Sequence, residues 1–311
     1  MINFDIKLGG EYKLVITKPD GTKQETGWFS NLILNQGLDR IGTSSNQIIS
    51  YAQVGTGNVA PAITQIGLNS FLAGSSQFTG VPVTNSGAPT YISNHVWNFP
   101  FAQGAVVGNI TEIGVGWAPT GNNLFSRALI LDNLGSPTSI TLVAIDQLTV
   151  YYRLKVVPPL TDVSSTVTIG GTPYNYTARV SSVGSFVFSS YTFWASQIGQ
   201  AGSMVYPYTA GTAGQTYGAG SVLGTITGTP TVQSGTGGSV TPGTYTPGTY
   251  TRDDTFNWSI TQGNATGGIQ AIVFYFAPQG GVSFQYRFTT VIPKDNTKTL
   301  SITTRITWTR I

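Results

Sequence analysis

The chain has 311 residues, of which 9% are charged and 40% hydrophobic, and its net charge is +3. Enough apolar side chains are present for a packed core, while a charged fraction far below the usual value of about 25% and a small net charge are unlike a disordered chain. Cysteine is absent, which excludes disulfides, thiolate zinc sites and cysteine nucleophiles.

Membranes and nucleic acids are not expected partners. The first residues carry no basic segment followed by an apolar run, so we expect no signal peptide. No stretch reaches the roughly 18 consecutive apolar residues that a transmembrane helix needs. Lys and Arg form no cluster that could neutralise phosphates, although the pI is about 9.0. We therefore expect no membrane insertion and no nucleic-acid partner.

The first predicted elements are a hairpin and one short helix. Residues 12–17 and 24–29 have strand-like composition and flank Pro19, Asp20 and Gly21, a typical turn sequence. Residues 31–42 then favour a helix, with Asn31 as a candidate N-cap and Gly42 just past the end.

Later segments alternate apolar and polar residues as strands do. Residues 110–117, 148–155 and 300–311 follow this period of two, and a run rich in Gly, Thr and Ser lies between them. The composition and the alternation together predict an all-β fold with one short helix.

The sequence also predicts an internal duplication. Eight residues recur unchanged 159 positions later: Asn98, Gln103, Gly104, Gly108, Ile113, Ala118, Pro119 and Phe125. The apolar alternation around them recurs as well. We expect two tandem β-sandwich-like domains, at 1–158 and 159–311, joined near residues 156–159.

Charge is distributed unevenly along the chain. No charged residue occurs over 41–111 or over 180–251. Free surfaces normally carry both signs of charge, so these tracts predict surfaces that neighbouring subunits cover. The alternative is a surface coated by Ser, Thr, Asn and Gly.

A low-complexity insertion lies within the second predicted domain. Residues 209–251 are nearly all Gly, Thr, Ser, Ala, Val, Tyr and Pro, and 241–245 repeats as 246–250. This composition predicts a projecting loop or hairpin that packs against something else. Candidate contact residues for another subunit or a sugar are its own and adjacent tyrosines: Tyr206, Tyr208, Tyr217, Tyr245 and Tyr250.

Catalytic and ligand-binding motifs are missing. His95 is the one histidine and has no Gly-x-Ser-x-Gly motif to serve, so a packing role is expected. Adjacent Asp253 and Asp254 would point to opposite faces of a strand, and Glu112 is expected in a salt bridge or as a hydrogen-bonded surface acid. Gly55 and Gly57 suggest a tight turn rather than a phosphate loop. We expect no catalytic residue, no cofactor and no metal site.

Several spaced motifs resemble structural proteins of tailed bacteriophages. Residues 27–41 (GWFSNLILNQGLDRI) are similar to a segment common near the start of such proteins. The motifs VGTG at 54–57, IGVGW at 113–117, LFSRALI at 124–130 and LTVYY at 148–152 follow in the same order. The resemblance covers residues 1–158, and the second half departs from it.

The resemblance implies a non-enzymatic virion component of the tail, collar or fibre. Such a protein would be made in the host cytoplasm and located in the virion. Its partners would be copies of itself and other virion proteins, with a trimer as first expectation and a six-fold ring as second. Two alternatives stay open: a carbohydrate-binding receptor module that contacts a host surface glycan and, ranked third, a glycan-cleaving spike.

Overall fold

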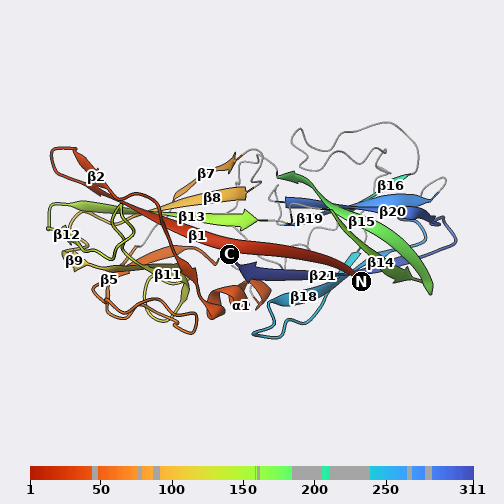
Figure 1. Ribbon diagram of the computed structural model, residues 1–311, viewed down its shortest axis with the longest axis horizontal. Helices are drawn as coiled ribbons and strands as arrows, with labels where there is room; N and C mark the ends of the chain where they lie inside the picture. The colour runs from red at the N-terminus through yellow and green to blue at the C-terminus, as the bar shows by residue number, and fades with distance from the viewer. Residues whose placement is uncertain are drawn as a thin grey trace.

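A computed structural model describes residues 1–43, 48–75, 79–86, 92–157, 159, 162–183, 205–209, 239–264, 268–276 and 282–311. Within these ranges strands predominate, and one α-helix, α1 (Asn35–Thr43), is present (Figure 1). The predicted all-β fold with one short helix is therefore confirmed.

A nine-stranded sheet forms the backbone of the molecule. Seven of its strands follow the order β17-β18-β21-β1-β13-β8-β7, and the short strands β2 and β3 pair with β1. Their bounds are β17 (Ser239–Pro242), β18 (Thr251–Trp258), β21 (Leu300–Arg310), β1 (Ile2–Thr17), β13 (Gln147–Val157), β8 (Ile92–Pro100), β7 (Thr79–Ser86), β2 (Lys23–Glu25) and β3 (Phe29–Ser30). The predicted hairpin at 12–29 is the pairing of β1 with β2, although β2 ends at Glu25 rather than at residue 29.

Two five-stranded sheets and one strand pair complete the fold. The first sheet has the order β4-β11-β10-β5-β6, the second has the order β14-β15-β20-β19-β16, and β12 pairs with β9. Their bounds are β4 (Leu32–Ile33), β11 (Leu124–Leu129), β10 (Glu112–Gly116), β5 (Tyr51–Gly55), β6 (Phe71–Gly74), β14 (Val163–Ile169), β15 (Thr172–Val183), β20 (Val282–Ile292), β19 (Ile269–Phe276), β16 (Val205–Thr209), β12 (Ile140–Leu142) and β9 (Gly108–Ile110).

One face of the nine-stranded sheet is buried along most of its width. Even-numbered residues of β21, β18 and β13 point inward, as the alternating sequence of these strands dictates, and odd-numbered residues point outward. The smaller sheets pack on this face: Tyr12 of β1 bonds to Ser126 of β11 at 2.8 Å, and Tyr286 of β20 donates to the carbonyl of Asn3 at 3.0 Å. The result is one continuous apolar core.

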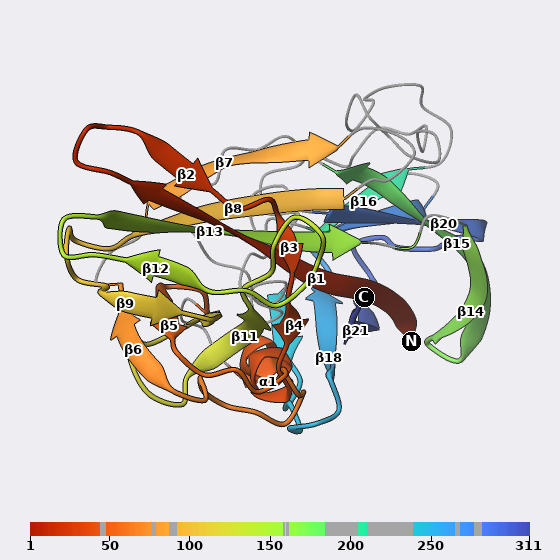
Figure 2. The same cartoon turned by 60° about the vertical axis from the view of Figure 1, so that its left-hand side comes forward.

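Strand β1 connects the two predicted domains. It runs along much of the long axis of the molecule (Figures 1 and 2) and pairs antiparallel with β13 and parallel with β21. Strands from both sides of residue 158 therefore share one sheet. The division into domains at 1–158 and 159–311 stays a prediction. Any boundary between the two domains would have to cross this shared sheet.

The two halves have matching strand orders. Seven strands of the first half follow each other across their sheets in the same order as seven strands of the second half. The corresponding pairs are β4 and β15, β5 and β16, β7 and β17, β8 and β18, β10 and β19, β11 and β20, and β13 and β21. Ile113 and Ile272 lie in corresponding strands, β10 and β19, while the registers of the two hairpins differ by one residue. The internal duplication stays a prediction, because unrelated β units can share a strand order.

The helix begins later than predicted. The sequence favoured Asn31 as N-cap, but α1 starts at Asn35, and Leu32–Ile33 form strand β4 instead. The reason is tertiary: β4 pairs with β11, and the amide of Leu34 donates to the carbonyl of Phe125 at 2.9 Å. Gly42, predicted beyond the helix, lies inside it.

Candidate functional site: an uncharged loop held by a buried ion pair

The loop between β5 and β6, residues 56–70, lies within the uncharged tract 41–111. This loop and the start of β6 present five large apolar side chains to solvent, each between 37% and 47% exposed: Val59, Ile63, Ile66, Phe71 and Leu72. We call these five residues the apolar loop surface. Exposed apolar patches are typical of interaction sites, and these five side chains belong to one segment of the chain.

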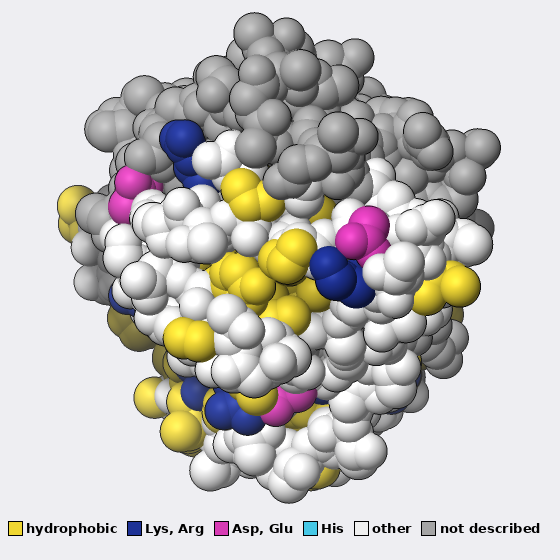
Figure 3. All heavy atoms as spheres, turned by 90° about the vertical axis from the view of Figure 1, so that its right-hand side faces the viewer, with side chains coloured by type: hydrophobic (Ala, Val, Ile, Leu, Met, Phe, Trp, Pro, Cys, Tyr) yellow, Lys and Arg dark blue, Asp and Glu magenta, His cyan; other side chains and the backbone are white. Residues whose placement is uncertain are grey.

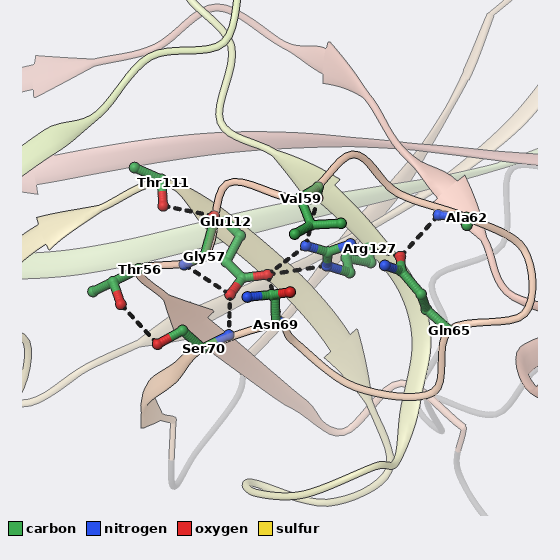
Figure 4. Close-up of polar contacts among 10 residues, drawn as sticks. All are labelled: Thr56, Gly57, Val59, Ala62, Gln65, Asn69, Ser70, Thr111, Glu112 and Arg127. Carbon is green, nitrogen blue, oxygen red and sulfur yellow. Dashed lines mark hydrogen bonds and ion pairs between the residues drawn. The ribbon is translucent and has the colours of Figure 1, made fainter.

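A buried carboxylate holds both ends of the loop. Oε1 of Glu112 accepts hydrogen bonds from the backbone amides of Gly57 at 3.0 Å and Ser70 at 2.7 Å, and Oε2 accepts one from Asn69 at 2.9 Å (Figure 4). Glu112 begins β10, which lies beside β5 in the sheet, so its side chain reaches the loop that follows β5. The fully buried carboxylate thus satisfies three loop amides.

Arg127 completes the arrangement. Its Nη2 lies 2.6 Å from Oε2 of Glu112 and also donates to the carbonyl of Val59 at 2.8 Å, while Nη1 donates to Oε1 of Gln65 at 2.5 Å. Both members of the ion pair are fully buried. The guanidinium therefore fixes the middle of the loop, while Glu112 fixes its ends.

Glu112 stays ionised because of its surroundings. Burial raises the pKa of Glu112, but hydrogen bonds from the amides of Asn69 and Ser70 and the charge of Arg127 outweigh it, and the pKa lies below its ordinary value. A buried ion pair contributes little net stability by itself, but loss of one partner leaves an unpaired charge in the core. The arrangement therefore fixes the geometry of the loop.

Further contacts fix the loop to α1. Nε2 of Gln36 donates to the carbonyl of Ile66 at 2.6 Å, and the amide of Asn35 donates to the carbonyl of Ile63 at 2.8 Å. Gly57 approaches Glu112 so closely that a Cβ there would lie 2.4 Å from Oε1. The apolar loop surface is thus presented by a segment with a defined shape.

The predicted contact tyrosines fall into three groups. Tyr245 and Tyr250 make intrachain contacts: the Tyr245 ring stacks on Trp308 at 5.6 Å, and Arg310 lies 5.8 Å from the Tyr250 ring centroid. Tyr206 and Tyr208 lie in strand β16, whose backbone pairs with β19. Tyr217 lies outside the described residues. The proposed contact roles of all five stay predictions.

The adjacent acids Asp253 and Asp254 each form an ion pair with an arginine. Asp253 points outward and pairs with Arg305 at 2.6 Å, while Asp254 is buried and pairs with Arg252 at 2.7 Å. Their opposite orientation is as predicted. The expectation that Glu112 forms a salt bridge is confirmed, but the alternative of a surface acid is wrong because the hairpin β10–β11 places it in the core.

The structure also places four of the tryptophans and His95. Trp97, Trp258 and Trp308 are buried, whereas Trp117 is half-buried under the guanidinium of Arg40. His95 lies in strand β8.

The partnership of Glu112 with Arg127 was missed by the sequence analysis. One signal was present: these are the first two charged residues after Arg40 in an otherwise uncharged region. The two residues lie diagonally across the β10–β11 hairpin, with Glu112 opposite Leu129 and Arg127 opposite Gly114, and isolated opposite charges at such a spacing indicate a buried pair. The apolar residues of the loop lack any regular period, so they gave no signal of their own.

Among the described residues, neither a metal-binding group nor a membrane-spanning helix is found. In the part of the chain that the structure describes, no three His, Cys, Asp or Glu side chains form a possible metal-binding group. Among the same residues, no helix has the length and apolar character to span a membrane.

Comparison with known proteins gives no match: no family model, no curated protein and no solved structure is similar to this chain.

Proposed function

We propose that this chain is a non-enzymatic structural component of a tailed-bacteriophage virion, in the tail, collar or fibre apparatus. It assembles with copies of itself and with other virion proteins through uncharged β surfaces. The observation that carries the proposal is the apolar loop surface, which a buried ion pair holds in one shape within an uncharged tract. Interfaces are depleted of charge at their centres, and a preshaped loop loses little entropy on binding.

The resemblance of residues 27–41 and of the later motifs to phage structural proteins supports the same proposal. The pairing of Glu112, Asp253 and Asp254 with arginines also favours a structural role, since paired carboxylates are poorly placed to act as a catalytic acid and base.

The first experiment measures the mass of the purified chain by sedimentation at micromolar concentration. We expect an oligomer, a trimer first and a six-fold assembly second. The double variant Ile63→Ser and Ile66→Ser should lower the oligomer fraction at least tenfold. Leu134→Ser is the matched control, because Leu134 is 91% exposed on another loop. A monomeric wild-type chain that stays soluble would contradict the proposal.

A second experiment removes residues 210–238 and repeats the mass measurement. These bounds keep β16 and β17 intact, together with the Tyr245 contacts that a deletion of all of 209–251 would destroy. We expect a smaller oligomer if the uncharged tract 180–251 supplies contacts. A glycan array, with a test for released sugar, separates the two alternatives: specific binding without release would indicate a receptor module, and release would indicate a spike.

A further inference from the structure

We propose that β14 pairs antiparallel with β14 of a second copy of this chain, about a two-fold axis at Thr166. The pairing joins two five-stranded sheets edge to edge. This inference rests on the proposed function only in requiring that copies of the chain associate; it adds the strand through which two of them meet.

Strand β14 is the edge of its sheet. All seven of its residues pair with β15, and no strand in the described part of the chain pairs with its other side. In both ribbon views β14 lies at the margin of the molecule (Figures 1 and 2). By comparison, the edge strands of the first five-stranded sheet are short, with two residues in β4 and four in β6.

The edge carries none of the usual protection against pairing. Proteins block exposed edges with charged residues, proline, bulges or short strands. The sequence of β14 is Val-Ser-Ser-Thr-Val-Thr-Ile, which has no charge, no proline and no glycine, and its pairing with β15 is continuous. Most of these residues are exposed and favour strands, so the edge is a ready template for another strand.

Figure 3 views the end of the molecule that lies at the right of Figure 1, where β14 is labelled. On the part of this surface that the structure describes, charged side chains of both signs are scattered, and hydrophobic side chains gather near the centre. A partner that approaches this end therefore meets little like-charge repulsion, as a second copy requires.

The sequence of β14 is complementary to itself in the antiparallel direction. A two-fold axis at Thr166 places Val163, which is 48% exposed, opposite the half-buried Ile169 of the second copy on the same face. On the other face, Ser164 lies opposite Thr168, and Thr166 faces its own copy. Val163 and Ile169 thus form apolar pairs, and hydroxyls meet hydroxyls on the other face, while Ser165 lies opposite the buried Val167.

The charged residue next to β14 is also compatible with the two-fold pairing. Asp162 precedes β14, and in the two-fold pairing it lies opposite Gly170 of the second copy. The two Asp162 residues are then eight positions apart along the ladder, roughly 27 Å. This contact is isologous and joins copies in pairs. In a trimeric assembly it would link two rings.

The test uses the absence of native cysteine. Thr166→Cys places two thiols directly opposite each other, where Cβ atoms in paired strands are about 4.5–5.5 Å apart, so oxidation should give a covalent dimer. Ser164→Cys is the matched control, because its two copies would lie roughly 14 Å apart. A mixture of separately purified Ser164→Cys and Thr168→Cys chains should form the mixed dimer, although neither forms one alone.

A charge variant gives an independent measurement. Thr166→Lys places two like charges opposite each other and should raise the dissociation constant of the two-fold contact at least tenfold. Ser139→Lys adds the same charge at an exposed position away from β14 and should leave that constant unchanged. Far-UV circular dichroism identifies variants that retain the native fold, and only these are compared.

Two results would overturn the inference: a folded Thr166→Cys chain that gives no covalent dimer, or a Ser164→Cys chain that crosslinks as fast. An oligomeric wild-type mass combined with either result would overturn the β14 contact while the proposed function stands. A monomeric wild-type mass would overturn both.

Discussion

The carboxylate of Asp39 in helix α1 accepts a hydrogen bond of 2.6 Å from the phenol of Tyr245, a residue 206 positions later in the chain. The same oxygen accepts a second bond from the amide of Gly248. The tyrosine ring lies against Gly42, where a Cβ would come within 2.4 Å of it, and stacks on Trp308. The described end of the Gly/Thr-rich insertion is therefore packed on the first half of the chain.

The first prediction concerns this contact. Tyr245→Phe keeps the ring but removes the hydrogen bond to a charged acceptor, and should lower the free energy of unfolding by about 1.5–3 kcal/mol. Urea denaturation followed by tryptophan fluorescence measures the change. Thr244→Ala, one position earlier, is the control and should change the free energy by less than about 0.5 kcal/mol. Equal effects at both positions would contradict the role of Asp39.

The second prediction concerns pH. The pKa of Glu112 is lower in the folded chain than in the unfolded chain, so its ionisation stabilises the fold above the unfolded pKa of about 4.3. This contribution is lost as pH falls from about 5 through the folded pKa. Glu112→Gln should cost about 3–5 kcal/mol at pH 7, because Arg127 is left without its anion, and less at pH 3.

Denaturation at both pH values measures this difference. Other carboxyl groups with lowered pKa values contribute to acid destabilisation of wild type and variant alike: Glu11, Asp20, Asp146 and Asp295. Only the difference in the free energy of unfolding between wild type and Glu112→Gln depends on Glu112. If this difference is the same at pH 7 and at pH 3, ionised Glu112 does not stabilise the fold as predicted. Glu25→Gln, at the exposed partner of Lys13, is the control.

The third prediction compares a buried arginine with an exposed one. Arg127→Met removes the partners of Glu112, Gln65 and the Val59 carbonyl, so the chain should lose about 3–5 kcal/mol of stability. Limited proteolysis should then cut within residues 56–70. Arg305→Met breaks an exposed pair with Asp253 and should cost about 0.2–1 kcal/mol without new cleavage. Cleavage elsewhere first would count against the loop assignment.

The fourth prediction tests the close approach at Gly57. A methyl group there meets Oε1 of Glu112, so Gly57→Ala should displace the carboxylate and cost roughly 1–3 kcal/mol. Gly27→Ala is the matched control, since the nearest atom to its Cβ is the Asn133 side-chain oxygen at 3.3 Å. Thermal unfolding of the two variants should give a lower midpoint for Gly57→Ala. Similar midpoints would mean that the loop can shift freely.

Much of the fold could be predicted because its information is local. The alternation in 300–311 identifies β21 and its buried face, with Trp308 at the correct position. The helix start could not be predicted, since Asn31 is a good N-cap by itself and the competing β4–β11 pairing comes from residues almost a hundred positions away. Tertiary pairing decided between two locally acceptable structures.

Less of the candidate site than of the fold could be predicted from the sequence. Glu112 was visible as an isolated acid, but its three amide donors come from a loop without periodicity, and backbone donors have no sequence signature. For Tyr245, composition indicated a contact residue without indicating its partner. Asp39 and Trp308 become its neighbours only through the arrangement of β1, β21 and α1.

The position of β1 between β13 and β21 also bears on synthesis of the chain. A ribosome adds about 5–20 residues per second, so Leu300 follows Thr17 by on the order of 15 to 60 seconds. During that interval β1 can already pair with β13, while its opposite edge over Ile2–Leu8 has no β21 to meet. The nascent first half thus carries an open strand edge until the last strand is made. Chains that meet at high local concentration, as on a polysome, would be most exposed to pairing with the wrong neighbour at this stage.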